Sequence, residues 1–136
     1  MKLATLFVLA AAAPLALAQA PSAPCPAPAE VSQAHMVGVW RAEFQGLWQG
    51  ATLLIEKHPE YEGSLSGGIN RNGEKGLIAG DVEKGELTLE ESADGKRISA
   101  TFLGDIVEGS CGREIRGTWQ AEDDSPVREF VLRKQP

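Results

Sequence analysis

The stretch Trp40-Arg41-Ala42-Glu43-Phe44-Gln45 alternates apolar residues with charged or polar ones. Successive side chains of a β-strand point to opposite faces, so a period of two residues indicates one dry face and one wet face. The same period recurs in the stretches 87–90, 98–102 and 115–121. The chain is therefore expected to consist of half-buried β-strands.

The distribution of glycine leaves little room for helices. All 15 glycines lie between Gly38 and Gly117, and the longest stretch without one in that region, 51–62, is interrupted by Pro59. An ordinary helix needs about 11–12 residues. Helices of ordinary length are thus nearly excluded from this region.

Turn signals divide the region into eight predicted strands. Asn72-Gly73 and Asp94-Gly95 suit tight hairpin turns, which require positive φ. The expected strands cover residues 37–45, 50–58, 63–71, 75–83, 86–92, 96–104, 113–122 and 127–134. The stretch 105–112 either extends the sixth strand or forms a loop, and the sequence leaves this open.

Eight short antiparallel strands joined by hairpins predict an all-β fold, an antiparallel up-and-down barrel that has no open sheet edge. A flattened sandwich of two sheets is the alternative. Glycines within the strands mark places where a small barrel bends sharply: Gly67, Gly68, Gly80 and Gly117.

The interior of a barrel of eight strands is wide enough either to be filled by side chains or to hold one small ligand. A packed core is the favoured interpretation. The large residues expected to face inward are Trp40, Phe44, Leu53 or Leu54, Leu65, Ile69, Leu87, Leu89, Ile98, Phe102, Ile115, Trp119 and Leu132. Small inward residues would leave room for a cavity: Ala42, Gly67, Ala79, Ala100 and Gly117.

The first eighteen residues have the pattern of a signal peptide, with Lys2 followed by an apolar run and by small residues around Ala18. Cleavage is expected after Ala18, and a retained membrane anchor is the alternative. A Pro-rich arm (19–36) would then precede a single barrel domain (37–136). The protein is expected to be periplasmic or secreted.

The charge of the chain argues against nucleic acid as a partner. The formal net charge is −6, and removal of Lys2 with the signal peptide makes it −7. Binding to a phosphate backbone requires clustered Lys and Arg residues, which this sequence lacks.

Two cysteines, Cys25 and Cys111, form an even pair in a chain that is expected to be exported. An oxidising compartment favours a disulfide between them. A lipid anchor at Cys25 is disfavoured because the preceding Ser22-Ala23-Pro24 does not fit a lipobox. A zinc site would need more ligands than these cysteines and two scattered histidines provide.

Catalytic chemistry finds little support in the sequence. His35 precedes the barrel and His58 lies in a turn, and neither is accompanied by a nucleophile motif. The turn 58–62 contains potential metal ligands, but a charged turn is more often simply solvated. Glu90 and Glu91 are expected to point to opposite faces of a strand, and Asp123-Asp124 to lie in a turn, so neither carboxylate pair specifies a general acid and base. No enzyme activity, cofactor or metal is predicted.

Gly38-Val39-Trp40 at the start of the first strand, the meander of eight strands, and Arg128 and Arg133 in the last strand together resemble the calycin pattern of lipocalins and avidins. The resemblance implies that Trp40 closes one barrel end and that Arg128 or Arg133 packs on its ring through a cation–π contact. It does not imply biotin binding, because the mid-chain tryptophans that wall the avidin pocket are missing here.

Leu47 and Trp48 break the pattern of a polar hairpin tip, since they lie between Gly46 and Gly50. An exposed Leu-Trp pair would be an anchor for a ligand or a protein partner. Alternatively, Trp48 would fold back over the barrel end as a lid. The residues predicted to bind a ligand or partner are Trp40, Phe44, Leu47, Trp48 and Trp119.

The predicted function is that of an exported, non-catalytic binding module. Its ligand would be a small apolar or amphipathic molecule held at the barrel mouth near the three tryptophans. The alternative is a periplasmic protein-interaction or enzyme-inhibitor module, by analogy with small exported barrels that inhibit metalloproteases and lysozymes.

Overall fold

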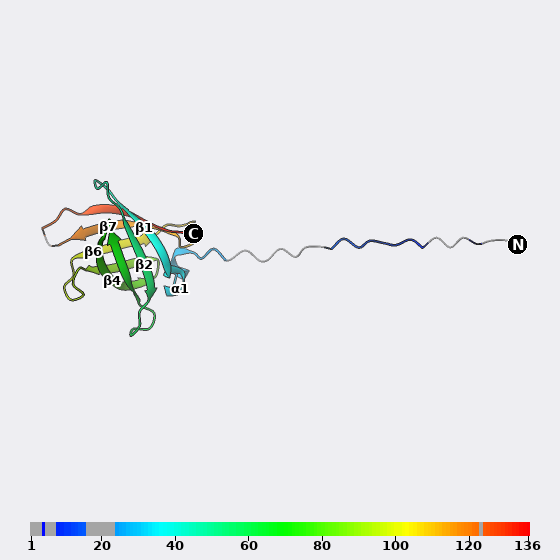
Figure 1. The fold of residues 1–136 in the computed structure, drawn as a ribbon, viewed down its shortest axis with the longest axis horizontal. Coiled ribbons are helices and arrows are strands. Elements are labelled where there is room, and N and C mark those ends of the chain that lie inside the picture. The colour runs from blue at the N-terminus through cyan, green and yellow to red at the C-terminus, as the bar shows by residue number, and fades with distance from the viewer. Residues whose placement is uncertain (1–3, 5–7, 16–23, 123) are drawn as a thin grey trace.

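The computed structural model describes residues 4, 8–15, 24–122 and 124–136. The expected all-β barrel is confirmed: eight antiparallel strands follow one another around a closed barrel (Figure 1). The strands are β1 (Gly38–Phe44), β2 (Ala51–Lys57), β3 (Leu65–Arg71), β4 (Glu74–Glu83), β5 (Glu86–Ser92), β6 (Ala100–Ile106), β7 (Glu114–Ala121) and β8 (Arg128–Lys134). The predicted cleavage site after Ala18, the start of the arm and Asp123 lie outside the described residues.

The barrel closes because β1 pairs with β8 as well as with β2. The β1–β8 register runs from Trp40 opposite Lys134 to Phe44 opposite Phe130. Each of the eight strands therefore has a hydrogen-bonded neighbour on both sides, and the sheet has no free edge on which another chain could add a strand.

The two predicted tight turns have different outcomes. Asn72 and Gly73 join β3 to β4 with φ values of 50° and 97°, as a two-residue hairpin turn requires. Asp94 and Gly95 belong instead to a longer connection, and β6 begins at Ala100 rather than at residue 96. The Asp94 carboxylate accepts hydrogen bonds from backbone N–H groups that follow it, and these replace the bonds of a β-ladder.

The stretch 105–112, which the sequence leaves open between strand and loop, contains both. Asp105 and Ile106 are the last residues of β6, and the chain then turns before β7 begins at Glu114. Cys111 lies in this turn with a φ of 57°, in the left-handed region.

The barrel interior is filled by one cluster of buried apolar side chains, so the packed core is confirmed. Leu53 faces inward and Leu54 outward. Two expectations are wrong: Ile98 lies exposed in the β5–β6 connection, and Ala79 is exposed because its neighbour Ile78 takes the inward position. Buried apolar residues that the pattern did not identify are Val31, Met36, Ala51, Ile55, Ile78, Ile106 and Phe130.

Some glycines within the strands allow neighbouring backbones to approach closely. A Cβ atom at Gly67, whose φ is 150°, would collide with the backbone carbonyl of Leu54 on β2. A Cβ atom at Gly117 would collide with the carbonyl of Leu103 on β6. Gly80 makes the same kind of close approach, to the Thr88 carbonyl, so three of the four predicted glycines lie where backbones come close; Gly68 does not, because a Cβ atom there would meet no close neighbour.

The N-terminal arm covers the barrel end at which β1 begins and β8 ends, here called the closed end. The arm contains the short helices η1 (Pro28–Glu30) and α1 (Gln33–Met36). The Met36 side chain is fully buried, and its carbonyl accepts a hydrogen bond from Trp40 Nε1 at 2.7 Å. No helix among the described residues has the length and apolar character needed to cross a membrane.

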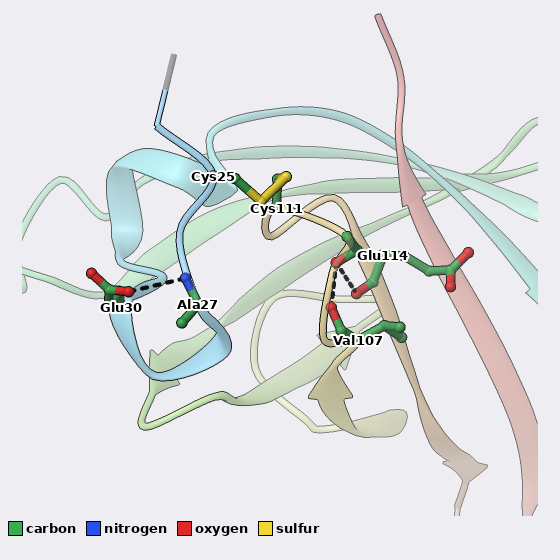
Figure 2. Close-up of a disulfide and its surroundings, with 7 residues drawn as sticks. Cys25, Ala27, Glu30, Val107, Cys111 and Glu114 are labelled. Atoms are coloured by element: carbon green, nitrogen blue, oxygen red, sulfur yellow. Dashed lines mark hydrogen bonds between the residues drawn. A yellow bond between two sulfur atoms is a disulfide. The ribbon is translucent and has the colours of Figure 1, made fainter. Parts of the chain in front are cut away.

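The predicted disulfide is confirmed and fixes the arm to the barrel (Figure 2). Cys25 Sγ and Cys111 Sγ are 2.03 Å apart, and 86 positions separate the two residues in the sequence. Next to Cys111, Ser110 Oγ donates hydrogen bonds to the carbonyls of Val107 and Glu114, at 2.6 and 3.4 Å. The turn that receives the arm is thus held by both a covalent bond and hydrogen bonds.

Candidate binding site at the barrel mouth

The end opposite the arm, here called the mouth, is occupied by four side chains that form the mouth cluster: Phe44, Arg71, Glu91 and Trp119. Each lies on an inward-facing position at or near the end of β1, β3, β5 or β7. Because these alternate strands all end at the mouth, inward-facing residues near their ends converge there.

The Arg71 guanidinium lies over two neighbouring aromatic rings and is paired with a carboxylate. Its guanidinium carbon is 5.3 Å from the Phe44 ring centroid and 4.9 Å from the Trp119 ring centroid. Arg71 forms a two-pronged ion pair with Glu91, in which Nη2 and Oε2 are 2.8 Å apart and Nη1 contacts Oε1. Planar, bidentate pairing of this kind combines electrostatic attraction with a defined orientation.

Glu91 is a charged residue in a buried position, with 5% of its surface exposed. Besides the Arg71 bonds, it accepts a hydrogen bond from Trp119 Nε1 at 2.9 Å. Removing one partner of a buried ion pair costs about 3–5 kcal/mol, because the other charge is left without compensation. The cluster therefore holds one arrangement of side chains across the mouth.

The cluster leaves a small hollow beside it. The hollow has a volume of about 140 Å³, and Arg71, Lys75, Glu91 and Ser99 are among the residues that line it. Sites for drug-sized ligands usually enclose roughly 300–1,000 Å³. The mouth is thus largely filled by protein side chains.

The structure brings only some of the predicted site residues together. Phe44 and Trp119 belong to the mouth cluster, with ring centroids 4.9 Å apart. Leu47 and Trp48 lie in the β1–β2 loop at the same end. Trp40 is fully buried near the closed end, where it contacts the arm.

The loop of residues 45–50 presents Trp48 to solvent. Trp48 is 90% exposed and Leu47 is 39% exposed, so Trp48 does not fold back over the barrel as a lid. The base of the loop is fixed to β8, because Gln45 N donates to the Glu129 carbonyl at 2.9 Å and Arg128 Nη1 donates to the Gln45 carbonyl at 3.2 Å. An exposed tryptophan therefore lies on a loop with a well-anchored base.

The basic residues of β8 do not have the role that the calycin resemblance implies. Arg128 binds the loop base at the mouth, and Arg133 pairs on the outer face with Glu114 at 3.0 Å and with Glu43 at 3.4 Å. Lys134 is the β8 residue opposite Trp40, and its Nζ donates to the His35 carbonyl at 2.7 Å. Burial beside the arm lowers the pKa of Lys134, and the nearby charge of Arg113 adds to this effect.

The histidines serve the local structure. His58 Nδ1 accepts hydrogen bonds from the backbone N–H groups of Glu60 and Tyr61, and His35 Nδ1 accepts one from the backbone N–H of Ser32. Within the described ranges, no three His, Cys, Asp or Glu side chains gather in a way that could hold a metal ion.

Arg71 and Glu91 were missed by the sequence analysis, which treated Glu90-Glu91 as a pair on opposite faces. That geometry is correct, since Glu90 is exposed and Glu91 is buried. The overlooked signal is that Glu91 continues the inward series of Leu87 and Leu89, and that Arg71 continues the series of Leu65 and Ile69. Two opposite charges at inward positions near the same barrel end indicate an internal ion pair.

Comparison with known proteins finds no protein-family model that matches the chain and no similar curated protein.

Proposed function

We propose that the protein is an exported, non-catalytic protein-interaction module whose partner is anchored by Trp48. The observation that carries this proposal is the 90% exposure of a tryptophan on a loop that is fixed to β8. Tryptophan is enriched among the residues that contribute most to binding at protein interfaces. A loop with an anchored base also loses less conformational entropy on binding than a free one.

The packed interior supports a protein partner over a small ligand inside the barrel. A molecule entering the mouth would have to displace the Arg71–Glu91 pair, and this would leave the buried charge of Glu91 uncompensated. The small apolar or amphipathic ligand expected from the sequence stays a prediction. A change in tryptophan emission on addition of one of a panel of hydrophobic metabolites would support it.

Export is supported by two features of the chain. The N-terminal sequence has the pattern of a signal peptide, and the Cys25–Cys111 disulfide fits a protein of an oxidising compartment. The closed meander of eight strands, with Gly38-Val39-Trp40 at its start, also supports a calycin-like scaffold. Calycins are binding proteins, so the scaffold agrees with the proposed role by analogy.

The test is capture of a partner from a cell-envelope extract of the producing organism. Wild type should retain one stoichiometric protein, and Trp48→Ala should weaken that complex by about thirtyfold or more, as expected for loss of a dominant anchor. Leu103→Ala is the matched control, because it removes an exposed apolar side chain from the outer face of β6. Equal retention by wild type and Trp48→Ala, or no stoichiometric partner, would contradict the proposal.

A further inference from the structure

A second candidate surface lies on the outside of the barrel, over β3 and β4. It is an open groove of about 610 Å³ whose floor includes the small, outward-facing residues Ser66, Gly68 and Ala79. Pro59 of the β2–β3 connection and Ile98 of the β5–β6 connection lie on its sides. This outer groove shares no residue with the loop that carries Trp48.

The floor is low because Gly68 lies in a row of otherwise apolar side chains. In the strand register Gly68 is opposite Leu54 on one side and Leu77 on the other, and both leucines are exposed, at 45% and 56%. A Cβ atom at Gly68 would have only the Gly76 carbonyl oxygen near it, at 3.6 Å. Leu77 and Gly68 both line the groove, so the hollow over Gly68 beside Leu77 can accept an apolar side chain from outside.

A second line of opposed residues crosses the floor of the groove, and it has an acidic residue at each end. Glu56 on β2 is opposite Ser66, Ser66 is opposite Ala79, and Ala79 is opposite Glu90 on β5. Neighbouring strands are about 4.8 Å apart, so these three steps span about 14 Å, the length of about four residues of extended chain.

Basic residues line the side of the groove formed by the β5–β6 connection. Asp94 Oδ1 accepts hydrogen bonds from the backbone N–H groups of Lys96 at 2.8 Å and Arg97 at 2.9 Å, which fixes the backbone of both residues. Their side chains line the groove and form no ion pair with any described residue. Two positive charges are thus available to a bound molecule.

We propose that the outer groove binds an extended segment of a protein partner. A large apolar side chain of the segment would sit over Gly68 beside Leu77. An acidic side chain would reach Lys96 and Arg97, and a basic side chain would reach Glu56 or Glu90. Charges of both signs around an apolar hollow match a segment that carries both signs beside an apolar residue.

An extended segment also fits the shape of the groove better than a second copy of this chain does. It is narrow enough to lie between the β2–β3 and β5–β6 connections. The broad outer face of a second barrel would rest on these connections and leave the hollow at Gly68 empty, and unfilled hollows give poor complementarity.

The test is selection from a displayed library of random peptides against the purified protein with its disulfide intact. Selected peptides should carry an apolar residue flanked by acidic and basic residues. Gly68→Leu fills the hollow, at a position where a side chain meets no close obstacle, and should weaken their binding by about tenfold or more. Thr118→Leu, on the outer face of β7, is the matched control and should bind as wild type does.

A second variant avoids any question of folding. Lys96→Glu with Arg97→Glu changes only exposed side chains and should abolish the preference for acidic residues in the selected peptides. Unchanged binding by both variants would overturn the proposal. Peptides that lose binding only with Trp48→Ala would also overturn it, although they would support the proposed role of the loop.

Discussion

At the closed end the barrel is covered by backbone, apolar side chains and a disulfide, whereas at the mouth it is covered by an ion pair that lies against two aromatic rings. The arm contributes Met36 and a covalent bond through Cys25. The mouth uses Arg71 and Glu91, which lie within the barrel strands themselves. The difference teaches that one end depends on a covalent tether, while the other depends on the pairing of a buried carboxylate with a partly buried guanidinium.

The largest expected effect comes from removing the tether. The double variant Cys25→Ser with Cys111→Ser should lower the free energy of unfolding by about 4–5 kcal/mol, because the disulfide closes a long loop in the unfolded chain. The barrel should still form, since its core does not include the cysteines. Urea unfolding gives the stability, and far-ultraviolet circular dichroism reports the fold.

The same prediction has a chemical control. Thiol titration of the unreduced protein, native and unfolded, should find no free cysteine among the two. Two titratable thiols in protein from an oxidising compartment would contradict the disulfide. A loss of less than about 1 kcal/mol in the double variant would mean that the tether contributes little to stability.

At the mouth, Glu91→Ala should lower the free energy of unfolding by about 3–4 kcal/mol, because Arg71 keeps its charge without a partner and Trp119 Nε1 loses its acceptor. Glu90→Ala is the matched control, since it removes the exposed neighbouring carboxylate and should change stability by less than about 0.5 kcal/mol. Equal effects of the two variants in urea unfolding would show that the ion pair does not hold the mouth.

Replacing both charged residues tests whether neutral side chains can cover the mouth as well as the ion pair does. Arg71→Met with Glu91→Gln removes both charges and keeps an amide oxygen that can accept the Trp119 Nε1 hydrogen bond. The free energy of unfolding should fall by about 1 kcal/mol, well below the fall for Glu91→Ala. The reason is that a buried ion pair adds little stability over neutral side chains of similar size. A double variant as unstable as Glu91→Ala would contradict this account.

The smallest expected effect on stability is that of pH, which acts through one carboxyl group near each end of the barrel. Backbone hydrogen bonds from Arg97 and then Lys96 lower the pKa of Asp94 in the β5–β6 connection. Burial raises the pKa of Glu114 at the start of β7, but hydrogen bonds from Arg116 and Arg133 outweigh it, so that the pKa is lowered overall. Both groups therefore contribute stability above their unfolded values of 3.8 and 4.5, and this stability is lost as the pH falls through the folded values.

Carbon-13 NMR titration of the two carboxyl groups measures this prediction directly. Arg133→Gln should raise the pKa of Glu114 and leave that of Asp94 unchanged, because Arg133 pairs with Glu114 and Glu43 and does not pair with Asp94. An unfolded-like pKa for either carboxyl in the wild type would contradict the role of its hydrogen bonds.

Much of the barrel could be predicted from the sequence because period-two patterning and glycine turns act over a few residues. The start of β6 could not, since Ser92 and Asp94 replace ladder bonds with side-chain bonds to the backbone in a stretch that still looks alternating. The same alternation predicts Ile98 to lie in the core, although it is exposed in that connection.

The candidate site was predicted less completely than the fold. The exposed Trp48 could be identified because it lies between two glycines where a polar tip is expected. The pairing of Arg71 with Glu91 depends on which strand ends converge at the mouth, and this information lies in the register of the whole barrel. The positions of Trp40 and Trp119 near different ends follow from the same register.

The disulfide also divides the chain into a covalent ring and a tail. The ring runs from Cys25 to Cys111 and contains β1–β6, whereas β7 and β8 follow it. A protease cut at Asn72-Gly73 would leave both fragments joined through the sulfurs, but a cut between β7 and β8 would leave β8 attached only by non-covalent contacts with β1 and β7. Limited proteolysis would therefore be far better tolerated in the first six strands than in the connection that precedes the last strand.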